Sequence, residues 1–95
     1  MSMREKTKKD SFIVMNEKGL HTRPSTELVR CAASFKCQVT LIYQSFTVNA
    51  KSLLGILMLA ASRGAKIRVE ATGVDAEEAV RSILDLARNK FNIKY

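Results

Sequence analysis

The chain has 95 residues, 46% of them apolar, and a formal net charge of +7. This length allows one small domain with one core, and the apolar fraction is too high for a disordered protein. No apolar run approaches the roughly 20 residues that a membrane-spanning helix needs, so we expect no membrane insertion. The first ten residues lack the apolar segment of a secretory signal, and we therefore place the protein in the cytoplasm.

The first ten residues, MSMREKTKKD, are polar and rich in basic side chains. We interpret residues 1–10 as a mobile basic extension and residues 11–95 as a single domain. The short apolar run Ser11–Met15 predicts the first strand, with Phe12 and Val14 on one face.

The stretch GLHTRPS, residues 19–25, contains the only histidine and the only proline of the chain. Pro24 suits the first turn of a helix, and a helical apolar stripe follows, made of Leu28, Cys31, Ala32 and Phe35. We expect this helix to end near Phe35, with His21 at its start. The free N–H groups and the dipole of a helix start favour an anion, and neutral imidazole is a competent nucleophile. His21 is therefore predicted to take up a phosphoryl group, with Arg23 holding its charge; the alternative is a histidine that only caps the helix.

Two strands are predicted after this helix. Cys37–Tyr43 alternates apolar and polar residues as a half-buried strand does, Gln44 and Ser45 form a two-residue turn, and Phe46–Asn49 pairs back. Cys31 and Cys37 are too few for a disulfide framework or a metal site, so we expect two buried or half-buried thiols.

Residues Lys51–Arg63 are predicted to form a second helix, with Ser52 as its N-cap and Gly64 ending it. Leucine, isoleucine and methionine nearly encircle this helix. The spacing favours a core-facing stripe of Leu53, Ile56, Leu57 and Ala60. Leu54 and Met58 then form an exposed apolar patch, because a helix lying on one sheet buries only one stripe. The alternative is a helix wedged deep in the core.

The last third of the sequence predicts a strand and a helix. Lys66–Thr72 alternates, with Ile67, Val69 and Ala71 pointing inward, and Asp75 is a suitable N-cap. The apolar stripe of the third helix is Ala76, Ala79, Val80, Ile83, Leu84, Ala87 and Phe91, and Asn92–Tyr95 is a short tail. The order β-α-β-β-α-β-α predicts an α+β fold, a two-layer open-faced sandwich with helices on one face of an antiparallel sheet.

Three stretches resemble the HPr family, the histidine-containing phosphocarrier of the bacterial phosphoenolpyruvate-dependent sugar phosphotransferase system. They are GLHTRPS around His21, VNAKSLLGILML around Ser52, and Arg63-Gly64-Ala65. The resemblance covers roughly Ser11 to Phe91. It implies a four-stranded antiparallel sheet in the order 1-4-2-3.

The resemblance also implies roles for the residues around His21. Nδ1 of His21 accepts a phosphoryl group from enzyme I and passes it to an enzyme IIA. Arg23 pairs with the phosphate, Pro24 keeps the helix start rigid, and the Thr22 hydroxyl could bind the phosphate or cap the helix.

For the second helix, the resemblance implies regulation and docking. Ser52 looks like the site that an HPr kinase modifies in many bacteria, and Leu53, Leu54 and Leu57 match the surface with which the family docks its partners. For Leu57 this implies exposure, against the core position that spacing alone favours. A monomer without metal or cofactor is expected.

Two alternatives to the carrier hypothesis are a mainly regulatory or nitrogen-branch relative and, remotely, a small nucleic-acid-binding domain. Only the charge supports the latter, so we expect no nucleic acid partner.

Overall fold

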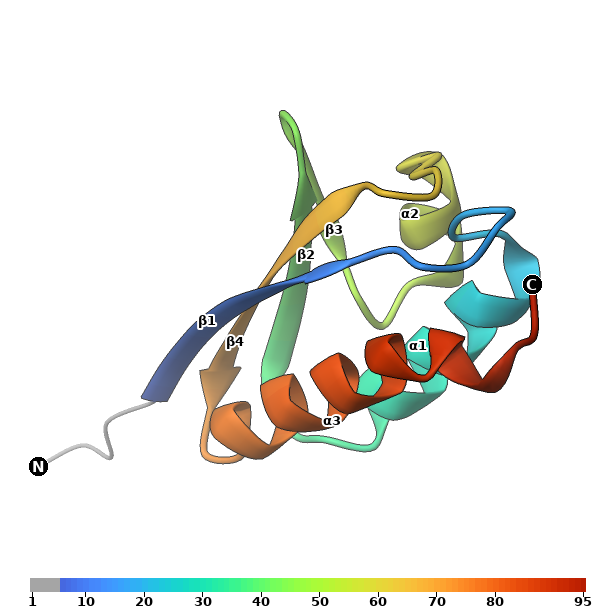
Figure 1. Ribbon diagram of the computed structural model, residues 1–95. Helices are drawn as coiled ribbons and strands as arrows, with labels where there is room; N and C mark the ends of the chain where they lie inside the picture. Colours follow the sequence, from blue (N-terminus) through green and yellow to red (C-terminus); the bar gives the residue numbers. More distant parts are fainter. Residues whose placement is uncertain (1–5) are drawn as a thin grey trace, which may run out of the picture.

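The computed structural model describes residues 6–95, which form one layer of strands and one layer of helices (Figure 1). The strands are β1 (Lys6–Ile13), β2 (Gln38–Tyr43), β3 (Phe46–Asn49) and β4 (Lys66–Gly73). The helices are α1 (Thr22–Ala33), α2 (Leu53–Met58) and α3 (Ala76–Arg88), followed by a 3₁₀ turn at Lys90–Asn92. The predicted order of the strands and α-helices is confirmed, but Phe91, predicted on the third helix, lies in the 3₁₀ turn beyond its end.

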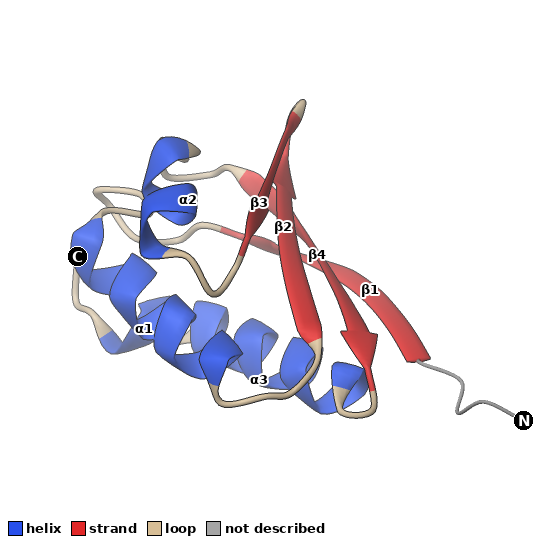
Figure 2. Ribbon diagram, turned by 180° about the vertical axis from the view of Figure 1, so that it is seen from behind, coloured by secondary structure: helices blue, strands red, loops and turns tan. Residues whose placement is uncertain are grey.

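The sheet is antiparallel in the order β1-β4-β2-β3, as predicted. The longest pairing joins β1 to β4 from Lys6 opposite Gly73 to Ile13 opposite Lys66. Figure 2 shows all three helices on one face of this sheet, with the other face uncovered. The fold class is therefore the open-faced two-layer sandwich that the sequence predicts.

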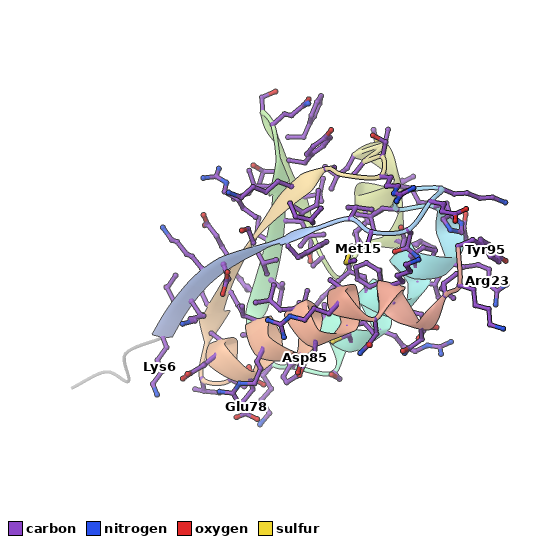
Figure 3. All side chains as sticks on the ribbon, viewed as in Figure 1. Lys6, Met15, Arg23, Glu78, Asp85 and Tyr95 are labelled. Carbon is purple, nitrogen blue, oxygen red and sulfur yellow. The ribbon has the colours of Figure 1, made fainter. Side chains whose placement is uncertain are left out.

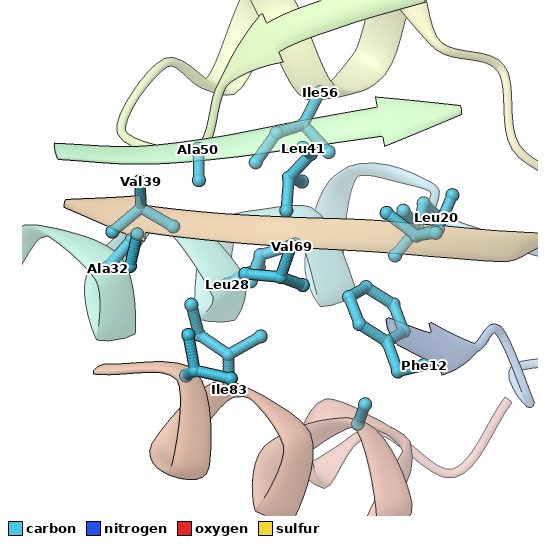
Figure 4. Packing of buried hydrophobic residues seen from close by; sticks show 14 of the residues in the cluster. Phe12, Leu20, Leu28, Ala32, Val39, Leu41, Ala50, Ile56, Val69 and Ile83 are labelled. Atoms are coloured by element: carbon cyan, nitrogen blue, oxygen red, sulfur yellow. The ribbon is translucent and has the colours of Figure 1, made fainter. Parts of the chain in front are cut away.

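The core lies between the sheet and the helices (Figure 4). On β4, Ile67, Val69 and Ala71 are fully buried, as their alternation predicts. Leu28 of α1 and Ile83 of α3 are also fully buried in the same cluster. This packing fixes the two long helices on the sheet and so fixes the position at which α1 begins.

The prediction of a mobile extension over residues 1–10 is wrong for its second half. Strand β1 begins at Lys6 rather than Ser11, although its side chains are exposed as far as Asp10. Main-chain hydrogen bonds to β4 do not depend on side-chain polarity, so a polar segment can extend a strand wherever a partner edge is available. Residues 1–5 lie outside the described part of the chain.

Helix α2 is shorter than predicted and ends at Met58 rather than Arg63. Ala60 has a φ of +49°, which turns the chain out of the helix. Ala60 is exposed, contrary to its predicted place in the core stripe, while Leu59 is buried. Gly64 lies in the turn before β4 and does not end the helix.

Asp75 precedes α3 as predicted, but its carboxylate does not cap the helix. It accepts hydrogen bonds from the N–H groups of Lys36 (2.8 Å) and Cys37 (2.9 Å), the two residues that directly precede β2. The bond from Lys36 is the main reason that the pKa of Asp75 lies below its usual value. The link fastens the loop after α1 to the start of α3.

Both thiols are free, and Cys31 is half-buried while Cys37 is buried, as predicted. Burial is the main cause that raises the pKa of Cys37 to about 11, and it also raises the pKa of Cys31. Neither thiol is therefore ionised near neutral pH.

Candidate functional site

His21 is the N-cap residue of α1 and has an extended backbone conformation. Its carbonyl accepts the first helical hydrogen bond, from the N–H of Ser25 (3.0 Å), and its ring is partly exposed. The prediction that His21 stands where a loop becomes a helix is confirmed. The first turn of α1 contains no acidic side chain, so its partial positive charge is available to an anion.

The loop before His21 is held against the segment that follows α2. Gly19 has a φ of +71°, and a Cβ there would lie 2.3 Å from the carbonyl oxygen of Ala61. The N–H of Leu20 donates to that same oxygen (2.9 Å), and the Ser25 hydroxyl donates to the Leu20 carbonyl (3.0 Å). Since Leu20 and Ser25 are buried, the histidine stands on a rigid support.

The neighbours of His21 differ in exposure. Arg23 is exposed, and its Nη1 donates to the hydroxyl of Tyr95 at 2.8 Å. Pro24 is buried in the first turn, where its missing N–H costs little. Thr22 is exposed and is the first helical residue, and the N-cap is His21. Of the two roles open to the Thr22 hydroxyl, capping the helix is therefore wrong, and binding the phosphate stays a prediction.

The C-terminal segment reaches the site, which the sequence analysis missed. The rings of His21 and Tyr95 are stacked, with centroids 5.6 Å apart and planes inclined by 21°. His21 Nε2 lies 3.1 Å from the main-chain oxygen of Tyr95. Figure 3 shows Arg23 and Tyr95 side by side at the end of the molecule where α1 begins. No local pattern in the sequence signals this contact, because more than 70 residues separate the two rings.

Ser52 caps α2 as predicted. Its hydroxyl accepts a hydrogen bond from the N–H of Gly55 (3.0 Å), and the residue is half-buried. The neighbouring Lys51 donates from Nζ to the carbonyl of Phe35 (2.8 Å), which ties the start of α2 to the end of the α1 region.

The apolar residues of α2 divide into two groups. Leu54 and Met58 are 69% and 71% exposed, as their spacing predicts. Leu53 and Leu57 are half-buried, while Ile56 is fully buried. The helix therefore offers an apolar surface of Leu53, Leu54, Leu57 and Met58, and the alternative of a helix wedged wholly into the core is wrong.

Within residues 6–95, no group of three or more His, Cys, Asp or Glu side chains could hold a metal ion. Among the same residues no helix has the length and apolar character needed to cross a bilayer.

The family described as "PTS HPr component phosphorylation site" matches residues 8–89. The chain belongs to the HPr family. It is 41% identical over 81 residues to the phosphocarrier protein HPr of Xylella fastidiosa, which covers 85% of this chain and 91% of the relative. It is 39% identical to HPr of Neisseria meningitidis over 83 residues, 87% of this chain and 93% of the relative.

The crystal structure of HPr-C-His from Thermoanaerobacter tengcongensis has the same fold. It superposes with a TM-score of 0.88 at 35% identity and covers 93% of this chain and 99% of that one. Membership of the HPr family makes this chain a phosphocarrier of the phosphotransferase system, and the matched region includes His21, Ser52 and the exposed surface of α2.

Proposed function

We propose that this HPr-family protein accepts a phosphoryl group on Nδ1 of His21 from phosphorylated enzyme I and passes it to an enzyme IIA. The proposal rests mainly on the contact between His21 Nε2 and the main-chain oxygen of Tyr95 (3.1 Å). That oxygen has no proton to give, so Nε2 must be the donor. The neutral ring then carries its lone pair on Nδ1, the nucleophilic atom of the proposal. Partial exposure of the ring allows a partner protein to reach it.

The surroundings of His21 suit a group that must be given up again. Arg23 and the start of α1 supply positive charge for the phosphoryl oxygens, while the exposed Thr22 hydroxyl is a further donor within the same turn. Pro24 keeps this turn rigid. A carrier must not bind the phosphoryl group too tightly, and one guanidinium with one helix end is a moderate set of positive groups.

Incubation with phosphoenolpyruvate and enzyme I tests the proposal. We expect one acid-labile, base-stable phosphoryl group per chain, and none on His21→Ala. Arg23→Lys keeps the charge but loses the planar fork of donors, so it should accept the group more slowly. Uptake of the group by His21→Ala would refute the proposed role of His21.

We propose that Ser52 is a regulatory site for an HPr kinase. Its hydroxyl lies at the start of α2, where an added phosphate meets free N–H groups. A phosphate group on this hydroxyl carries close to two negative charges. Ser52→Asp should slow phosphoryl transfer to His21, with Ser52→Ala as the neutral control. Two results together would favour a mainly regulatory protein. Ser52→Asp would have to slow transfer to His21 severely, and the wild-type protein would have to give no detectable transfer to any enzyme IIA.

We propose that Leu53, Leu54 and Leu57, together with Met58, dock enzyme I and the other partners. Removal of exposed apolar side chains from a short helix costs the protein little stability. The same side chains supply most of the apolar area for an interface. Leu54→Gln and Met58→Gln should raise the KM of enzyme I for this protein while leaving its unfolding free energy nearly unchanged. Phe46→Ser is the matched control, because Phe46 is also exposed (56%) but lies at the β2–β3 hairpin.

We propose that the protein works as a monomer in the cytoplasm and without a nucleic acid partner. Strand β1 forms an edge of the sheet and carries exposed lysines at Lys6, Lys8 and Lys9. Charged side chains on an edge strand oppose pairing with a second copy. Light scattering should give the mass of one chain, and a nucleic acid partner would require a salt-dependent shift with RNA or DNA.

A further inference from the structure

The segment Lys90–Tyr95 is directed toward His21 by the fold itself. Lys90, Phe91 and Asn92 all have a positive φ, of 54°, 55° and 62°. Each such conformation is unfavourable for a residue with a side chain, so it persists only where the surroundings compensate. The fully buried ring of Phe91 packs edge-on against Phe12, with centroids 5.8 Å apart, and this contact holds the turn in place.

A buried amide fastens both ends of the segment. Asn16 is fully buried, and its Nδ2 donates to the main-chain oxygen of Lys90 (2.9 Å) and to that of Tyr95 (3.4 Å). Asn16 lies at the start of the loop that carries His21. Asn16 therefore joins the loop that carries His21 to both ends of the C-terminal segment, and these two hydrogen bonds place Tyr95 next to His21.

The side chain of Tyr95 contacts three groups of the site at once. Its ring stacks on the imidazole of His21, and its hydroxyl accepts from Arg23 Nη1 at 2.8 Å. The ammonium of Lys18 lies 4.9 Å from the ring centroid, and Arg23 Cζ lies 5.9 Å from it. Apart from these contacts, Arg23 is an exposed side chain on the first turn of a helix, free to adopt many rotamers.

We propose that Tyr95 is a positioning residue for phosphoryl transfer at His21, whose ring and hydroxyl hold the imidazole and the Arg23 guanidinium in place before the phosphoryl group arrives. This inference rests on the proposed function of His21. One of the five N–H donors of Arg23 is engaged by the phenol oxygen, and the remaining donors are left for phosphoryl oxygens. The long arginine side chain then loses its conformational entropy before transfer rather than during it.

In the transfer step, the Nδ1 lone pair of His21 forms a bond to phosphorus. The bond between phosphorus and the donor nitrogen of enzyme I breaks, and its electron pair stays on that nitrogen. The proton on His21 Nε2 remains on the ring, which gains a positive charge, and the main-chain oxygen of Tyr95 accepts from it throughout. The phenol of Tyr95 gains and loses no atom and acts only through Arg23 and the ring stack.

Single-turnover transfer from phosphorylated enzyme I to Tyr95→Phe provides the test. This variant keeps the ring stack and the main-chain oxygen but loses the bond to Arg23. We expect the maximal rate to fall about three- to tenfold, as the loss of an exposed hydrogen bond to a charged group would give, with the half-saturating concentration unchanged. Tyr43→Phe is the matched control, because Tyr43 lies on β2. This variant should accept the phosphoryl group at the wild-type rate.

A double-mutant cycle separates positioning from a general structural effect. In an Arg23→Ala background, Tyr95→Phe should have no further effect, because the hydroxyl acts through the guanidinium. In the unphosphorylated protein, NMR should show a slowly rotating Arg23 guanidinium that becomes mobile in Tyr95→Phe, and a ring-current shift of His21 that persists in Tyr95→Phe but not in Tyr95→Ala.

A wild-type rate for Tyr95→Phe, an equal effect of that substitution in both backgrounds, or an Arg23 signal unchanged by it would each overturn the positioning role. In all of these cases His21 would still be phosphorylated, so the carrier function would stand. Failure of the wild-type chain to accept a phosphoryl group would instead refute the proposed function.

Discussion

Gly19→Ala should lower the unfolding free energy of this protein more than Gly64→Ala does, although both glycines have a positive φ. The φ values are +71° and +89°, so each alanine meets a similar backbone cost of about 1–2 kcal/mol. Each also gains a similar offset, since alanine restricts the unfolded chain more than glycine does. The difference between the two variants therefore isolates the surroundings of the added methyl group.

Those surroundings differ sharply. At Gly64 an added Cβ meets no atom within 4 Å, whereas at Gly19 it lies 2.3 Å from the Ala61 oxygen and 2.9 Å from Ser62 Cα. A carbon and a carbonyl oxygen do not normally approach closer than about 3.3 Å, so the loop must move by about 1 Å. That movement breaks the Leu20–Ala61 hydrogen bond, which contributes about 1 kcal/mol.

We therefore expect Gly19→Ala to lose at least about 1 kcal/mol more than Gly64→Ala in urea unfolding, and its Tm to be lower by about 4–8 °C. Because this loop carries His21, Gly19→Ala should also accept the phosphoryl group more slowly, while Gly64→Ala should not. Equal unfolding free energies for the two variants would show that the contact with Ala61 does not hold the loop.

Three further predictions concern stability and the titrating groups. Ser52→Ala should lose about 1 kcal/mol in urea unfolding, because the N–H of Gly55 loses its cap, and Ser45→Ala in the hairpin turn should not. The raised pKa of Cys37 means that the unfolded thiol ionises first, so stability should fall between pH 9.0 and about 11, and Cys37→Ala should be less sensitive there; an identical alkaline profile for both proteins would contradict this. The lowered pKa of Asp75 means that its contribution is present above pH 3.8 and is lost as the pH falls through its value in the folded protein, a dependence that Asp75→Asn should weaken in acid unfolding.

Local sequence patterns were sufficient for most of the fold. Period-two alternation identified the inward face of β4. Helical spacing identified Leu28 and Ala32 of α1 and the five buried residues of α3, whereas Cys31, Phe35 and Leu84 of the predicted stripes are only half-buried. These patterns work because a strand or a helix on one layer has a dry side and a wet side. The GLHTRPS stretch likewise placed His21 correctly at the start of α1, since the preference of Pro24 for a first turn is local.

The sequence by itself determined strands β2, β3 and β4, the helix starts and the placement of the histidine, because each depends on residues within a few positions of one another. The tertiary structure alone decided where β1 begins, where α2 ends and which residue covers His21. The polar start of β1 is ordered by the main chain of β4. Helix α2 ends at Met58, and the segment after it turns at Ala60 so that Ala61 can accept a hydrogen bond from the N–H of Leu20. Tyr95 reaches His21 only because Phe91 and Asn16 turn the chain end back, and such contacts between distant segments leave no periodic trace in the sequence.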